Sequence, residues 1–90
     1  LENQNEILFM QLVMQNQQIA MMLLGKVANP VTNKSEVNLE HAKYTIDMLD
    51  MLLIKTNGNL SEYESKFLNE VIRELKLNYV ELLDKNPNTA

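Results

Sequence analysis

Apolar residues recur every three or four positions along three long segments of the chain, a spacing typical of amphipathic α-helices. It predicts helices over about residues 5–24, 39–57 and 62–85. No segment shows the strict alternation of apolar and polar residues that marks a half-buried β-strand. The pattern therefore predicts an all-α protein, folded as a single helical domain over residues 1–90.

A polar loop separates the first two predicted helices. Gly25 suits the left-handed position just after a helix, and Asn38 suits the N-cap of the next helix. Between them, Asn29-Pro30 disfavours helix at the centre of the loop. A loop of this length lets the first helix pack on the other two helices of its own chain or on those of a neighbouring copy. The sequence leaves both arrangements open.

A much shorter turn, over residues 57–60, separates the second and third predicted helices. Gly58 ends the second helix, and Ser61 with Glu64 has the spacing of a capping box at the start of the third. Because so short a connection cannot reach across a bundle, we expect these two helices to form an antiparallel hairpin.

Apolar residues are most concentrated in the first predicted helix. Residues 7–25 hold 13 apolar residues among 19, against 10 of 19 in residues 39–57, and no charged residue lies between Glu6 and Lys26. A helix that buries one face needs only about three apolar residues in seven. We therefore expect this helix to be buried in a homo-oligomer, with a dimer favoured. The predicted interface residues are Phe9, Met10, Leu12, Val13, Met14, Ile19, Met22 and Leu23.

The same uncharged stretch approaches the length of about 20 residues that a membrane span requires. Five amide side chains lie in its middle, however, and each would need a hydrogen-bond partner at bilayer depth. Amides fit better between helices, where they pair and fix the register. We therefore expect no membrane span. The five residues are Gln11, Gln15, Asn16, Gln17 and Gln18.

Charge and composition exclude several classes of function. Eight Lys and Arg residues face twelve Asp and Glu residues, for a net charge of −4, and no segment is basic, so we expect no binding to nucleic acid. The absence of Cys excludes disulfides, iron–sulfur clusters and Cys-based zinc sites. We expect a cytoplasmic protein without a cofactor.

A string of short motifs, in order and with matching spacing, covers most of the chain. They are Phe9-x-x-Leu12-Val13, Leu24-Gly25, Asn29-Pro30-x-Thr32, Leu39-Glu40-x-Ala42, Lys55-Thr56-x-Gly58-Asn59-Leu60 and Tyr79-Val80-Glu81. From Phe9 to Glu81 the chain resembles an uncharacterised bacterial family, the domain-of-unknown-function family numbered eighteen forty-four. The resemblance implies a small helical protein, and it brings no established activity, cofactor or catalytic residue.

The most motif-like stretch is Lys55-Thr56-x-Gly58-Asn59. One interpretation is an interaction site, in which Lys55 supplies charge and the N-terminus of the next helix offers free N–H groups to an anion. The other is turn chemistry, which accounts for Gly58 and Asn59 but not for Lys55 or Thr56. We favour turn chemistry because helix ends need these residue types in any case.

Few residues suggest catalysis or metal binding. His41 is the only His, and the Glu-x-x-His pattern of carboxylate metal bundles is absent because residue 38 is Asn. Asp47 is expected on a polar face or paired with Arg73 or Lys76 across the hairpin. No nucleophile, second His or phosphate loop accompanies it. We therefore expect neither a catalytic nor a metal site.

The sequence favours a non-enzymatic, homo-oligomeric helical assembly or adaptor module that acts by contacts with an unidentified protein partner. The alternative is a helical bundle that binds a small apolar or anionic ligand, for which the six Met residues would supply an adaptable apolar lining.

Overall fold

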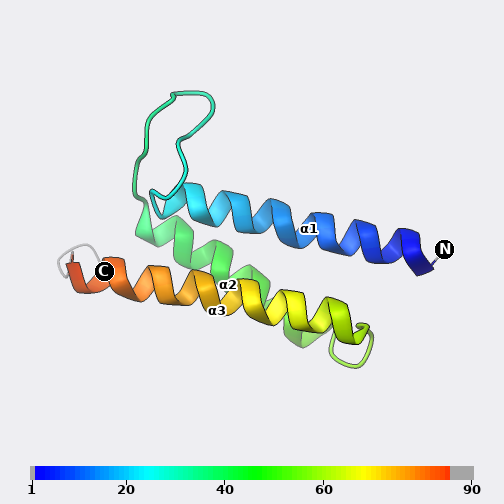
Figure 1. The fold of residues 1–90 in the computed structure, drawn as a ribbon. Helices are drawn as coiled ribbons and strands as arrows, with labels where there is room; N and C mark the ends of the chain where they lie inside the picture. The colour runs from blue at the N-terminus through cyan, green and yellow to red at the C-terminus, as the bar shows by residue number, and fades with distance from the viewer. Residues whose placement is uncertain (1, 86–90) are drawn as a thin grey trace.

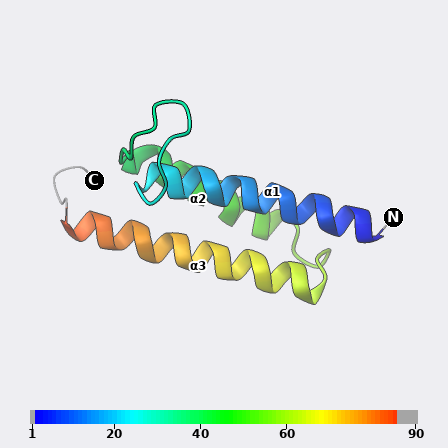
Figure 2. The same ribbon diagram turned by 45° about the horizontal axis from the view of Figure 1, so that its top comes forward.

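The computed structural model describes residues 2–85, with side chains from residue 4, and over this range the protein is built from three helices. They are α1 (Glu2–Leu23), α2 (Leu39–Lys55) and α3 (Glu62–Lys85). Figures 1 and 2 show the three helices lying side by side, with α2 running opposite to α1 and α3. The described residues contain no strand, only an isolated bridge between Leu24 and Val37, so the all-α prediction is confirmed for this range.

The core lies where the three helices meet, and its residues follow the three-and-four spacing of the sequence. All are less than a tenth exposed, and Val13, Ala20, Ala42, Leu68 and Leu75 are completely covered. The remaining members of this core are Leu24, Leu39, Ile46, Leu49, Val71 and Ile72. Because α1 contributes Val13 and Ala20, it packs against α2 and α3 of its own chain, which is one of the two arrangements that the sequence left open.

The helix bounds differ slightly from those expected. The first helix begins at Glu2 rather than near residue 5 and ends at Leu23, and α3 has the expected bounds. The second ends at Lys55 rather than at residue 57. The helical pattern ends after Thr56, whose N–H still donates to the carbonyl of Leu52, four residues back, at 3.0 Å. The N–H of Asn57 instead donates to Ile54, three residues back, at 3.3 Å, and Gly58 then takes a left-handed φ of 87°.

Gly25 ends α1 in the arrangement known as a Schellman motif. The φ of Gly25, 76°, is left-handed. The N–H of Lys26 donates to the carbonyl of Met21 at 2.9 Å, and the N–H of Gly25 donates to the carbonyl of Met22 at 3.0 Å. The loop that follows returns to the same place, because the N–H of Asn38 donates to the carbonyl of Leu23 at 2.7 Å. The end of α1 is thereby tied to the start of α2.

We predict that Gly25→Ala costs more stability than Gly58→Ala. Both glycines have left-handed φ angles, of 76° and 87°, so each alanine is strained by about 1–2 kcal/mol. A Cβ on Gly25 would also lie 2.8 Å from Cγ2 of Val37, whereas one on Gly58 would meet nothing within 4 Å. Urea unfolding should therefore show a loss of about 2–4 kcal/mol for Gly25→Ala and about 1–2 kcal/mol for Gly58→Ala. Equal losses would contradict the close packing of the loop on the end of α1.

Candidate functional site

An exposed row of mostly apolar side chains runs along α1 and is here called the α1 seam. Its positions alternate steps of three and four, which is the spacing of a coiled-coil contact line. Three of its aliphatic residues are exposed: Leu8 keeps 54% of its surface accessible to solvent, and Leu12 and Ile19 each keep 44%. The α1 seam consists of Asn5, Leu8, Leu12, Gln15, Ile19 and Met22.

The eight residues predicted for an oligomer interface divide between two environments. Val13 is completely buried in the chain's own core, and Phe9 and Leu23 pack against that core. Leu12, Met14 and Ile19 are exposed, while Met10 and Met22 are half-buried. Three of the eight, Leu12, Ile19 and Met22, belong to the α1 seam. Contact between any of the eight and another chain remains a prediction.

The predicted interface residues did not include Asn5, Leu8 or Gln15 of this surface, although Gln15 was among the amides expected between helices. The first helix is apolar around most of its circumference, so composition did not distinguish the row that faces the core from the rows that face outward. The signal that could have found them was the unbroken three-and-four spacing from Asn5 to Met22.

The α1 seam ends in an apolar hollow where the loop meets α1. Ile19 and Met22 line it together with Val27, Ala28 and Pro30, and its volume is about 270 Å³. Ile19, Val27 and Pro30 are themselves exposed, so the hollow opens at the surface and is no enclosed ligand cavity.

The start of α3 carries the predicted capping box and joins α1 to the hairpin. The N–H of Ser61 donates to Oε1 of Glu64 at 2.7 Å, and the N–H of Glu64 donates to Oγ of Ser61 at 3.1 Å. The Ser61 hydroxyl in turn donates to Oε2 of Glu6, on α1, at 3.1 Å. With Glu62 in the first turn as well, the chain's own carboxylates surround this helix end. They disfavour an added anion there by like-charge repulsion.

The four residues of the Lys55 motif lie on the turn between α2 and α3. The hydroxyl of Thr56 donates to the carbonyl of Leu52, and the N–H of Asn59 donates to the carbonyl of Thr56 at 2.9 Å. Gly58 has the left-handed backbone that the turn requires. Lys55 is exposed at the end of α2, where its charge complements the helix dipole. The turn thus occupies Thr56, Gly58 and Asn59, and a role of Lys55 in binding remains a prediction.

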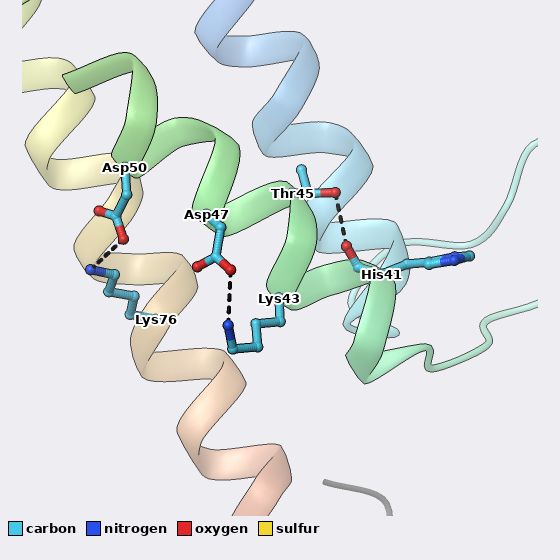
Figure 3. Close-up of polar contacts among 6 residues, drawn as sticks. All are labelled: His41, Lys43, Thr45, Asp47, Asp50 and Lys76. Carbon is cyan, nitrogen blue, oxygen red and sulfur yellow. Dashed lines mark hydrogen bonds and ion pairs between the residues drawn. The ribbon is translucent and has the colours of Figure 1, made fainter. Parts of the chain in front are cut away.

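His41 lies in the first turn of α2, beside the N-cap. Its backbone N–H donates to Oδ1 of Asn38 at 3.1 Å, and its Nδ1 lies 3.2 Å from Nδ2 of the same residue, which confirms Asn38 as the cap. Its carbonyl accepts the hydroxyl of Thr45 at 3.0 Å (Figure 3). Among residues 4–85, no three His, Asp or Glu side chains are grouped so that they could hold a metal ion.

Of the two positions expected for Asp47, the structure shows the polar face and not the pairing with Arg73 or Lys76. Asp47 is exposed and accepts from Nζ of Lys43, one turn earlier, at 2.8 Å, whereas Asp50 pairs with Lys76 of α3 at 2.9 Å (Figure 3). Asp50 lies in the same helical row as Ile46, four residues away, and so faces α3. Lys43 donates a hydrogen bond to Asp47, and this bond together with the charge of the carboxylate raises the pKa of Lys43 above its ordinary value.

Comparison with known protein families assigns the chain to one of them. It matches the family described as Domain of unknown function (DUF1844) over residues 6–81. The chain belongs to this family. The match confirms the resemblance carried by the sequence motifs, and the family description gives no activity. No curated protein and no solved structure matches the chain. Among the described residues of this DUF1844 chain, no helix is long and apolar enough to cross a membrane.

We predict that the cost of Ser61→Asp depends on Glu6. Aspartate keeps the N-cap but replaces a hydroxyl donor with a second carboxylate against Glu6, which the native hydroxyl contacts at 3.1 Å. In urea unfolding, Ser61→Asp should lose about 1 kcal/mol in the native background and about zero in a Glu6→Ala background. An equal loss in both backgrounds would show that α1 does not meet α3 at this point.

Proposed function

We propose that this DUF1844 protein is a homodimeric helical assembly module, which acts by helix–helix contacts and not by catalysis, and that two copies pair along the α1 seam. The observation that carries the proposal is the row of exposed apolar side chains at coiled-coil spacing on a helix whose opposite face already fills the core. Soluble chains seldom leave so ordered an apolar row in water.

The chemistry of the α1 seam favours a second copy as its occupant. Each copy has a net charge of −4, so self-association requires a contact surface free of repulsion. No charged residue lies between Glu6 and Lys26, which meets that requirement. Leu8, Leu12 and Ile19 then supply the apolar contacts.

Gln15 gives the pairing its register. It is the exposed amide near the middle of the α1 seam, with apolar residues of the row on both sides. An amide both donates and accepts hydrogen bonds, so Gln15 is complementary to Gln15 of a second copy. A register that placed this amide against Leu or Ile would leave it without a partner, which costs about 1–3 kcal/mol. We infer that the two-fold axis passes beside Gln15.

Ligand binding is the weaker alternative. A bundle that holds a small apolar molecule needs an enclosed cavity, and the apolar hollow beside Ile19 and Met22 opens at the surface. An anionic ligand at the α3 N-terminus would meet the carboxylates of Glu6, Glu62 and Glu64. Protein contact through the α1 seam meets neither difficulty.

We predict that the wild-type protein sediments as a dimer at micromolar concentration and that Leu12→Glu or Ile19→Glu raises the dimer dissociation constant about tenfold or more. Both residues are 44% exposed in the single chain, so the substitutions leave its core intact. Analytical ultracentrifugation measures the change, and circular dichroism confirms that the helices remain.

The matched control is Leu77→Glu, which places the same substitution on an exposed residue of α3, at 60% exposure. It should leave the dissociation constant within about twofold of wild type. A wild-type protein that sediments as a monomer at these concentrations would overturn the proposal. So would a loss of association that is equal for the α1 variants and for Leu77→Glu.

A further inference from the structure

A groove runs along the outer side of α2 and α3, distinct from the α1 seam. Two hollows, of about 410 and 580 Å³, adjoin there and share Leu53 and Asn69 as lining residues. The first lies at the turn end, beside Leu60, and the second extends to Asp50 and Lys76. No residue of the α1 seam lines either hollow. We call this surface the α2–α3 groove.

The floor of the α2–α3 groove is apolar. Ile72 belongs to the core and keeps 6% of its surface exposed, while Leu53 and Leu60 are half-buried. Ile54 stands at the edge with 73% of its surface exposed. Covering these side chains would remove apolar area from water, which favours an occupant with an apolar face of its own.

Cations outnumber carboxylates on the rim of the groove by three to two. Lys66, Arg73 and Lys76 line it, with Asp50 and Glu70 as the carboxylates. Lys76 is paired with Asp50 at 2.9 Å (Figure 3), but among the described residues neither Lys66 nor Arg73 forms an ion pair. One rim carboxylate, Glu70, therefore faces two rim cations, in a chain whose net charge is −4.

The spacing of the two cations matches a helical occupant. Lys66 and Arg73 are seven residues apart on α3, a rise of about 10 Å, which places them in one row along the helix. Two carboxylates seven residues apart on a second helix would match them. Along α3 the lining residues run from Ser65 to Lys76, a rise of about 17 Å, which accommodates roughly three helical turns.

We propose that the α2–α3 groove binds an amphipathic helix of a partner protein, with its apolar stripe on Leu53 and Ile72 and its Asp or Glu side chains against Lys66 and Arg73. A second copy of this chain is a poor occupant. The α1 seam of such a copy lacks the acidic partners that the rim requires, because residues 7–23 contain no carboxylate. The groove thus gives an adaptor module its second surface, one that accepts a different protein.

The probe is a synthetic, fluorescein-labelled helical peptide of about 16 residues, with Leu at alternating steps of three and four and Glu beside them, and its sister carries Gln in place of every Glu. Fluorescence anisotropy with the full chain should show that the Glu peptide binds about tenfold more tightly than the Gln peptide. Arg73→Glu and Lys66→Glu should each weaken binding of the Glu peptide about tenfold, and Glu70→Gln should strengthen it about twofold.

Two control variants make the result specific. Lys85→Glu reverses an exposed cation of α3 outside the groove and should change the affinity less than about twofold. Leu12→Glu, which disrupts the proposed dimer, should leave peptide affinity unchanged. Sedimentation therefore tests dimerisation through the α1 seam, and anisotropy tests peptide binding in the groove, independently of each other. The proposal is overturned if neither peptide binds, if the two peptides bind equally, or if Lys85→Glu weakens binding as much as Arg73→Glu. Loss of peptide binding in Leu12→Glu would also overturn it, by moving the binding site to α1.

Discussion

The packing of α1 on its own hairpin is the constraint on which the rest of the structure depends. A helix in a three-helix bundle can turn only one face toward its two neighbours. Here that face is narrow, with Val13 and Ala20 completely covered. The apolar residues of α1 extend well beyond it, so the fold that buries Val13 leaves Leu8, Leu12 and Ile19 in water. The monomer satisfies its core and still retains an apolar surface.

Local hydrogen bonds at the helix ends hold this arrangement in place. Gly25 closes α1 and brings the loop back to Leu23, so that α2 starts beside the end of α1. At the opposite end of the bundle, Ser61 caps α3 and donates its hydroxyl to Glu6 of α1. Because both ends of α1 are tied to the hairpin, the direction in which its outer face points is fixed. A fixed outer face is what a dimer interface requires.

The features that the sequence predicted are those that depend on neighbouring residues. Helix existence, the Asn38 cap and the Ser61–Glu64 box follow from side chains within a few positions of one another. Pairings between distant elements were beyond it. Asp50, and not Asp47, meets Lys76, because the choice depends on how α2 is rotated against α3. The α1 seam became distinguishable only once the core-facing row of α1 was known, since the helix is apolar nearly all round.

Cross-linking at position 15 tests the central claim, that two copies meet along the α1 seam, most directly. The chain has no Cys, so Gln15→Cys provides a single thiol, and Leu77→Cys provides a matched exposed thiol on α3. If the two-fold axis passes beside residue 15, mild oxidation should convert Gln15→Cys into a covalent dimer, since a disulfide forms only when the two Cα atoms lie within about 7 Å. Leu77→Cys should remain monomeric on reducing-agent-free gels. Equal, slow cross-linking of both variants would contradict the account.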